Sequence, residues 1–254
     1  MSLKGKVAFV TGAGQGIGAA IIHRLADEGC RLILADINAE QLSLLSKKLD
    51  EKGIDCLSLV VDITDKCAVE KVVNSAIERW GTIDILVNNA GIIRDGFISN
   101  ISEQDWDQVL DVNLKAAFLC CQAVFPIMKK NCTGKIINIV SRAWLGNVGQ
   151  ANYSASKGGL VSLTRTLALE FARYDINVNA VAPGLIDTPM TQGMPEAAKE
   201  RLLKMQPTGK MGSVEDIAAA VKRAYEAVAM IQFNGAHYRK DIASRALSRM
   251  SGDV

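Results

Sequence analysis

The sequence is poor in the features that mark several classes of protein. It has only two histidines, His23 and His237, which lie far apart, and its six cysteines form no Cys-x-x-Cys pair. This pattern predicts no metal site and favours reduced thiols over a disulfide framework. The formal net charge of +2 is too small to indicate nucleic acid or a membrane surface as a partner. Since no apolar run approaches the roughly 18 residues of a membrane span and no signal-peptide pattern opens the chain, we expect a cytoplasmic protein.

What the sequence has in quantity is apolar residues. Of its 254 residues, 49% are hydrophobic and 22% are charged, as in ordinary soluble domains. A chain of this length could form one large domain or two small ones. Because no internal repeat, low-complexity tract or Pro/Ser-rich linker divides it, we predict a single domain over residues 1–254, with an atypical segment from about residue 222 to 254.

Short apolar runs alternate with longer helical patterns along most of the chain. The expected strands cover residues 6–12, 31–36, 56–62, 83–91, 135–141 and 176–184. The expected helices cover residues 19–29, 39–53, 66–81, 103–130 and 154–174, the fourth of them broken or ended near Pro126. The strand runs are continuously apolar, which is typical of strands buried on both faces of a parallel sheet. The predicted fold class is therefore α/β, a Rossmann-like doubly wound parallel sheet with helices on both faces in three α/β/α layers.

Four glycines stand in the stretch TGAGQGIG, residues 11–18, directly after the first apolar run. In such a sheet this turn follows the carboxyl end of a strand and opens a helix, and ligands bind there. Glycines let the backbone approach a pyrophosphate, and the helix N-terminus offers free N–H groups to it. The spacing Gly12-x-x-x-Gly16-x-Gly18 differs from the commoner G-x-G-x-x-G, and a purely structural turn is the alternative.

Asp36 ends the second expected strand, where a carboxylate can accept hydrogen bonds from an adenosine ribose and would repel a 2′-phosphate. Gln15 brings no positive charge to the glycine turn, and Arg31 lies at the far end of the strand. We therefore predict NAD as the cofactor in preference to NADP. The alternative is that Asp36 only caps the following turn. Asp62, after the third strand, could contact the adenine with Ile63 packed beside it.

Tyr153 and Lys157 stand four residues apart in NYSASKGG, a separation that places both side chains on one helix face. A tyrosine with its usual pKa near ~10 is a poor acid or base at neutral pH. A nearby ammonium and the positive nicotinamide ring would favour the phenolate. Ser141 ends the preceding strand, so its hydroxyl could meet the same substrate oxygen. Tyr-x-x-x-Lys is common by chance, but it is much more specific beside a nucleotide turn and this serine.

Together these features resemble the classical subgroup of the short-chain dehydrogenase/reductase family, over about residues 4–220. The matching pieces are TGAGQGIG, Asp36, VDI at 61–63, NNAG at 88–91, Asn113, Ser141, Tyr153, Lys157 and APG at 182–184. The resemblance implies that Tyr153 is the general acid/base and that Ser141 polarises the substrate oxygen. It implies that Lys157 lowers the pKa of Tyr153 and binds the nicotinamide ribose. Asn113 would hold a water that links Lys157 to solvent.

The turn and the resemblance together define the expected site residues. The expected cofactor-binding residues are Gly12, Gln15, Gly16, Ile17, Gly18, Asp36, Ile37, Asp62, Ile63, Asn89, Ala90, Gly91, Tyr153, Lys157, Pro183, Gly184, Ile186 and Thr188. The expected substrate-binding residues are Ser141, Trp144, Tyr153 and Met190, with residues 189–206 as a lid. The alternatives are that Asn113 merely kinks its helix and that NNAG is only a strand-to-loop turn.

Within the family, NNAGIIRDG, GKIINIVS, GNVGQANYSASKGGL and VAPGLIDTPMT are similar to 3-oxoacyl-[acyl-carrier-protein] reductases and to NAD-linked enzymes acting on coenzyme A thioesters. The implied substrate is a 3-oxoacyl or 3-hydroxyacyl thioester. The chain departs from the carrier-protein enzymes in having Gln15 and Asp36 where they use a basic residue, and MKKNCTG lacks their carrier-binding arginine. A dehydrogenase of cyclic or sugar-type secondary alcohols is the alternative enzyme. A non-catalytic NAD-sensing regulator is the alternative from another class, although such proteins usually lose the tyrosine or lysine.

The last part of the chain departs from the family pattern. The Val-Asp-Gly-Gly ending is absent, although residues 236–240 could still form a seventh strand. Residues from about 222 onward instead resemble the carboxyl terminus of phosphoribosylamine–glycine ligases, a different fold, but no ATP-grasp body accompanies them. Family tetramers pair through the last strand and the helix beside it. We expect a homo-oligomer, a tetramer or a dimer, and the atypical segment affects how its subunits would assemble.

Overall fold

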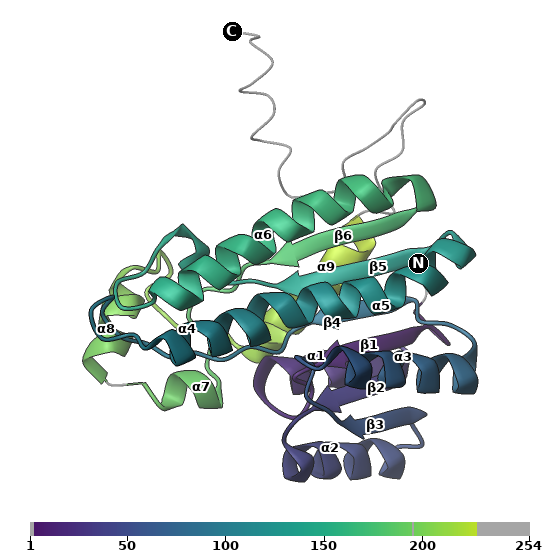
Figure 1. Ribbon diagram of the computed structural model, residues 1–254. Helices are drawn as coiled ribbons and strands as arrows, with labels where there is room; N and C mark the ends of the chain where they lie inside the picture. Colours follow the sequence, from purple (N-terminus) through teal and green to yellow (C-terminus); the bar gives the residue numbers. More distant parts are fainter. Residues whose placement is uncertain (1–2, 195, 228–254) are drawn as a thin grey trace, which may run out of the picture.

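The computed structural model describes residues 3–194 and 196–227, which build one six-stranded sheet (Figure 1). Its strands are β1 (Val7–Thr11), β2 (Arg31–Asp36), β3 (Cys56–Val60), β4 (Ile85–Asn88), β5 (Gly134–Ile139) and β6 (Ile176–Val181). Their order across the sheet is β3-β2-β1-β4-β5-β6, with parallel pairing throughout. The predicted doubly wound α/β fold and the six expected strands are confirmed.

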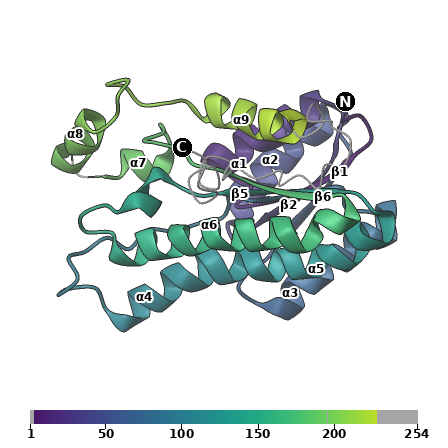
Figure 2. The same cartoon turned by 90° about the horizontal axis from the view of Figure 1, so that it is seen from above.

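Helices cover both faces of this sheet. They are α1 (Gly16–Asp27), α2 (Ala39–Glu51), α3 (Lys66–Trp80), α4 (Glu103–Leu110), α5 (Ala116–Asn131), α6 (Ala151–Phe171), α7 (Pro189–Gln192), α8 (Glu196–Lys204) and α9 (Val214–Ala227). Figure 2 shows α1, α2 and α9 on one side of the sheet and α3, α5 and α6 on the other. Val7 and Phe9 of β1 pack toward α3, α5 and α6, and Ala8 and Val10 pack toward α1, α2 and α9. This alternation explains why β1 is apolar at consecutive positions.

The long helix predicted over residues 103–130 is present, but it is irregular at a different place. The chain continues through α4, a π-helical turn at Asp111–Lys115 and α5 to Asn131. Pro126 lies inside α5, so the predicted break near it is wrong. Pro126 is exposed, and water can bind the carbonyl oxygen that a proline leaves without an N–H partner. The irregularity falls at the turn that contains Asn113, and π-turns often occur at functional sites.

By length and composition, Glu103–Asn131 is also apolar enough to cross a membrane. In the fold, however, Ala116, Cys120, Val124 and Met128 are fully buried in the core cluster that includes residues of the central strands. This is the placement of a core helix in a globular protein.

The strand order reverses between β1 and β4, and Asn89 joins the carboxyl ends of these two strands. Its side-chain amide donates to the carbonyl oxygens of Thr11 at 3.0 Å and Gly12 at 2.9 Å. The Thr11 hydroxyl accepts hydrogen bonds from the backbone N–H groups of Asn89 at 3.1 Å and Ala90 at 3.2 Å. The two strand ends are therefore fixed at the point where a doubly wound fold binds its ligand.

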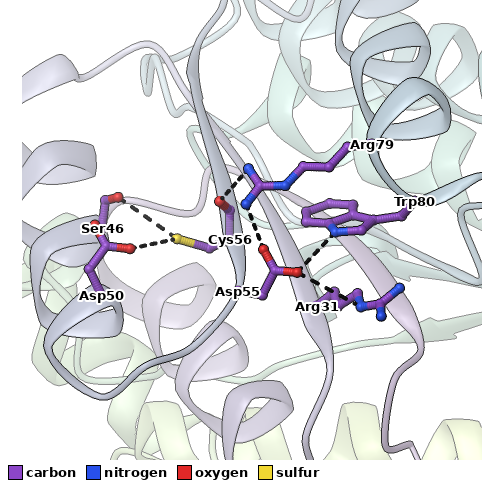
Figure 3. Close-up of polar contacts among 7 residues, drawn as sticks. All are labelled: Arg31, Ser46, Asp50, Asp55, Cys56, Arg79 and Trp80. Carbon is purple, nitrogen blue, oxygen red and sulfur yellow. Dashed lines mark hydrogen bonds and ion pairs between the residues drawn. The ribbon is translucent and has the colours of Figure 1, made fainter.

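Asp55 fastens the end of α3 to the start of β2 (Figure 3). Its carboxylate accepts hydrogen bonds from Arg79 at 2.6 Å and from the Trp80 indole at 3.0 Å, and it lies 3.8 Å from the Arg31 guanidinium. Arg31 is thus paired at the opposite end of β2 from Asp36.

The chain after β6 forms three helices that the sequence patterns did not reveal. Figure 1 shows α7 and α8 beyond the carboxyl ends of the strands. α9 returns to pack against α1, and Lys222 pairs with Glu28 at 2.6 Å. The first residues of the atypical segment, 222–227, thus belong to α9. The possible strand at 236–240 and the ligase-like tail lie outside the described residues.

Candidate active site

Backbone geometry explains the glycines between β1 and α1. Gly12 has φ +62° and Gly16 has φ +55°, values that favour glycine. A Cβ on Gly12 would lie 2.8 Å from Ala90 Cα, and a Cβ on Gly18 would lie 1.9 Å from the carbonyl oxygen of Gly12. α1 begins at Gly16, earlier than predicted, and its N-cap Gln15 makes no side-chain cap bond. The N–H groups of the first turn are therefore left for a ligand to satisfy.

A cavity of about 510 Å³ opens at the carboxyl ends of the strands. Its walls include most of the residues predicted to bind the cofactor: Gly12, Gln15, Gly16, Ile17, Asp36, Ile37, Asp62, Ile63, Asn89, Ala90, Gly91, Tyr153, Lys157, Pro183, Gly184, Ile186 and Thr188. Gly18 does not line the cavity; its contact with Gly12 lets α1 start close to β1. The sequence reasoning missed other wall residues, among them Asn38 and Val112, which no motif marks.

The Asp36 carboxylate is oriented by the backbone around it. Its Oδ2 accepts a hydrogen bond from the N–H of Gly14 at 2.8 Å, and its Oδ1 accepts one from the N–H of Asn38 at 2.9 Å. The second bond is the turn cap that was the alternative role for this residue, so capping accompanies the placement in the cavity wall. Asp62 is held similarly, because its Oδ1 accepts bonds from the N–H and hydroxyl of Thr64 at 2.9 and 2.7 Å.

Ser141, Tyr153 and Lys157 meet at one end of this cavity. α6 begins at Ala151, earlier than predicted, so Tyr153 lies in its first turn and Lys157 one turn further on. Lys157 Nζ lies 5.7 Å from the centre of the Tyr153 ring and donates a hydrogen bond to the carbonyl oxygen of Ile139 at 2.9 Å. Ser141 follows β5 and hydrogen-bonds to the Tyr153 hydroxyl.

Burial shifts the titration of both ionisable groups. Lys157 is only 3% exposed, and burial lowers the pKa of its ammonium from 10.5 to about 8. Lys157 therefore stays mostly protonated at neutral pH. Burial raises the pKa of the Tyr153 hydroxyl; the hydrogen bond with Ser141 opposes this rise, and the charge of Asp95 adds to it. The protein groups alone thus do not produce the lowered tyrosine pKa that the sequence predicts.

Asn113, the fourth residue predicted to take part in catalysis, is 1% exposed. Its side-chain oxygen accepts a hydrogen bond from the N–H of Ile92 at 2.8 Å, and its amide nitrogen donates to the Ile92 carbonyl at 3.0 Å and to the Ser156 hydroxyl at 3.2 Å. Ser156 in turn donates to the carbonyl oxygen of Tyr153 at 2.8 Å. Asn113 therefore supports the first turn of α6, and its water relay to Lys157 stays a prediction.

A smaller cavity of about 110 Å³ meets the larger one at Ser141 and Tyr153. Met190, predicted to bind substrate, lines both cavities, and Leu202 of α8 with Met205 and Gln206 after it completes the smaller one. Trp144 lies on a 3₁₀ turn, is 38% exposed, and is not among the described wall residues of either cavity. The structure thus does not bring Trp144 to the site, and its contact with substrate stays a prediction.

The sequence reasoning also missed a chain of polar side chains beside Tyr153. Gln150 is 6% exposed and stands at the N-cap of α6. Its amide donates to the Asp95 carboxylate at 2.8 Å and accepts a hydrogen bond from Asn147 at 2.8 Å. Burial raises the pKa of Asp95, while the bond from Gln150 opposes that rise. The only signal in the sequence is the place of Gln150 shortly before Tyr153.

Comparisons with known proteins show the family of the chain. A family model described as "short chain dehydrogenase" matches residues 6–199. The (2S)-[(R)-hydroxy(phenyl)methyl]succinyl-CoA dehydrogenase subunit BbsD of Thauera aromatica is 46% identical over 218 residues, which are 86% of this chain and 88% of the relative. The 3-oxoacyl-[acyl-carrier-protein] reductase FabG of Thermotoga maritima is 43% identical over 222 residues, 87% of this chain and 90% of the relative.

Among solved structures, an NAD⁺-bound xylitol dehydrogenase superposes with a TM-score of 0.83 at 33% identity, covering 88% of this chain and 93% of the other. These matches extend over most of the chain. The chain therefore belongs to the short-chain dehydrogenase/reductase family and is an oxidoreductase with a nicotinamide cofactor.

Proposed function

We propose that this protein is an NAD-dependent oxidoreductase that moves hydride between nicotinamide and a 3-oxoacyl or 3-hydroxyacyl thioester. The observation that carries the proposal is the meeting of two cavities at Ser141 and Tyr153, one large enough for a dinucleotide and one suited to an acyl group. The names of BbsD and FabG describe acyl groups on coenzyme A and on acyl carrier protein, which supports a thioester substrate.

The walls of the large cavity fit a dinucleotide. The glycine turn leaves room for a pyrophosphate where a Cβ on Gly12 or Gly18 would clash. Asp36 would accept hydrogen bonds from the adenosine ribose and repel a 2′-phosphate, which supports NAD over NADP. Ile37 is 71% exposed at the cavity wall and offers apolar surface to the adenine, as does Ile63. When bound, NAD supplies or accepts the hydride.

The residues at the junction would move the proton. Both the Ser141 and Tyr153 hydroxyls would hydrogen-bond to the substrate oxygen. Tyr153 would donate its proton to that oxygen during ketone reduction and accept it during alcohol oxidation. The Lys157 ammonium, held by Ile139 at 2.9 Å, stabilises the phenolate that reduction leaves on Tyr153. Asn113 keeps this turn of α6 in place and would carry the water relay.

We further infer that the protein acts in the cytoplasm as a homo-oligomer. Phe118 on α5 is 43% exposed and Leu169 on α6 is 57% exposed, and a second copy would cover these apolar side chains. Sedimentation at micromolar concentration should give a dimer or tetramer, and a monomer would contradict this part of the proposal.

The enzymatic proposal is tested by the absorbance loss of NADH with acetoacetyl-CoA. Tyr153→Phe should lower kcat about 100-fold or more, because it removes the proton donor. Tyr174→Phe is the matched control, since Tyr174 follows α6 and packs on Phe125 outside both cavities. Equal kcat values for Tyr153→Phe and the native enzyme would refute the role of Tyr153 as proton donor. Faster oxidation of xylitol or a cyclic alcohol would favour the alternative substrate class, and faster turnover with NADPH would contradict the cofactor assignment.

A further inference from the structure

Arg142 is the charged side chain among the described wall residues of the small cavity. The wall is otherwise neutral, with methionine and leucine side chains contributed by the lid at Met190, Met194, Leu202 and Met205. A single guanidinium in an otherwise uncharged cavity gives that cavity a positive potential.

The backbone of Arg142 is fixed beside the reacting groups. Its N–H donates a hydrogen bond to the carbonyl oxygen of Pro183 at 2.9 Å. The hydroxyl of Ser141 accepts a hydrogen bond from the N–H of Ala143 at 3.2 Å, which closes the 3₁₀ turn on which Arg142 lies. Arg142 is therefore held on the short turn that follows Ser141, and both residues line the small cavity together with Tyr153.

Arg142 is half-buried as a residue, and its guanidinium makes no side-chain hydrogen bond or ion pair within residues 3–194 and 196–227. Several other arginines of the protein are paired. Arg31 and Arg79 both contact Asp55 (Figure 3), and Arg94 lies 3.7 Å from Asp105. Withdrawing a guanidinium from water without a partner is unfavourable. An arginine without an acidic partner at a cavity wall is therefore expected where a bound ligand supplies the negative charge.

The acidic side chain that neighbours this part of the site is already bonded. Asp95 accepts a hydrogen bond from Gln150 at 2.8 Å and feels the charge of Arg201. Asp95 is not part of the described wall of the small cavity, whereas Gln150 is. The Asp95 carboxylate is thus bonded to Gln150 and forms no ion pair with Arg142 in the described residues, so the charge of Arg142 is left for the substrate.

We propose that Arg142 binds a carboxylate on the acyl group, so that the preferred substrate is a thioester of a short dicarboxylic acid that bears the reacting ketone or alcohol. This inference rests on the proposed function. A planar carboxylate matches the two parallel N–H donors of a guanidinium. The cavity volume of about 110 Å³ leaves room for a short acid and not for a long fatty acyl chain. A phosphate of the carrier has related chemistry, and it is the second source that the experiment must separate.

The test compares matched acyl groups on a carrier without phosphate. NADH oxidation is measured with the N-acetylcysteamine thioesters of 3-oxoadipate and 3-oxohexanoate, and with the longer pair 3-oxopimelate and 3-oxoheptanoate. The native enzyme should prefer the dicarboxylic member of at least one pair by about 10-fold or more in kcat/KM. Arg142→Met should reduce that preference by about 10- to 100-fold, mainly through KM, and Arg142→Lys should restore part of it. Arg201→Met is the control, because Arg201 is a nearby cation outside the cavity wall, and the preference should stay within about twofold.

The outcomes separate this inference from the proposed function. If no 3-oxoacyl thioester is reduced, the proposed function itself fails. If the monocarboxylic thioesters are reduced as well as the dicarboxylic ones, and Arg142→Met leaves the ratio unchanged, the carboxylate assignment is overturned while the proposed function stands. If Arg142→Met impairs only coenzyme A thioesters, and equally for both acids, Arg142 binds a carrier phosphate and the assignment is likewise overturned.

Discussion

Lys157→Met should abolish activity and yet stabilise the protein near pH 7. Burial lowers the pKa of the Lys157 ammonium from 10.5 to about 8. Keeping this group protonated therefore costs the folded state about 3 kcal/mol at neutral pH. Methionine removes that cost, but the Ile139 carbonyl loses a donor at 2.9 Å, which is unfavourable by about 1–2 kcal/mol. The net expected gain in the free energy of unfolding is about 1–2 kcal/mol.

The pH dependence gives this prediction its sign. The folded-state pKa of Lys157 lies below the unfolded-state value, so the unfolded chain binds more protons between about pH 8 and pH 10.5. The stability of the native sequence must therefore rise relative to Lys157→Met as the pH increases through this window. From pH 7 to about pH 9.5 the expected relative rise is about 2 kcal/mol. Burial raises the pKa of the Tyr153 hydroxyl above its ordinary 10.0, so Tyr153 stays mostly protonated in the folded state up to pH 9.5 and contributes little to the difference.

The assay is urea unfolding of both proteins without cofactor at the two pH values. Lys71→Met is the control: Lys71 is exposed on α3, so its ammonium stays in water in both states and its replacement should have the same effect at both pH values. A stability difference between native protein and Lys157→Met that does not change with pH would refute the argument. It would mean that Lys157 is not desolvated in the folded protein.

Two further substitutions test the cavity walls. Gly18→Ala places a methyl 1.9 Å from the carbonyl oxygen of Gly12, so NADH binding, measured by fluorescence, should weaken at least about 10-fold. Gly158→Ala is the control, because nothing lies within 4 Å of its new methyl, and it should bind NADH normally. Equal NADH affinities of the two variants would contradict the account of the glycine turn. Gln206→Leu removes the amide oxygen that accepts a hydrogen bond from the N–H of Leu185 at 2.9 Å. The KM for acetoacetyl-CoA should therefore rise several-fold, while kcat changes less. An unchanged KM would show that this hydrogen bond does not hold the lid.

The parts that sequence predicted well are those in which the residue pattern is itself the physical cause. The apolar run at Val7–Val10 is buried on both faces, so its continuity marks a central strand. At Gly12 and Gly18 the neighbouring backbone lies too close for any Cβ, so the glycines in the sequence indicated a ligand site at this turn. Tyr153 and Lys157 share a helix face by their spacing alone.

The parts that sequence missed depend on tertiary context. Pro126 was expected to interrupt its helix, but its exposed position lets water satisfy the freed carbonyl. The π-turn at Asn113 involves no proline or glycine, and the sequence indicated it only as the alternative in which Asn113 kinks its helix. Arg142 follows a recognisable serine, but its placement in a cavity depends on the turn that Ser141 caps.

A ladder of buried polar side chains links β4 and β5 to α6. The Asn88 amide at the end of β4 donates to Asn138 on β5 at 2.8 Å, and Asn138 donates to the Thr164 hydroxyl on α6 at 2.8 Å. Thr164 lies two turns after Lys157, on the same face of α6. Because all three ladder residues are buried in an apolar surrounding, sliding α6 along the sheet would leave polar groups without partners. The ladder therefore sets the height of α6 above β4 and β5, and through it the position of Lys157.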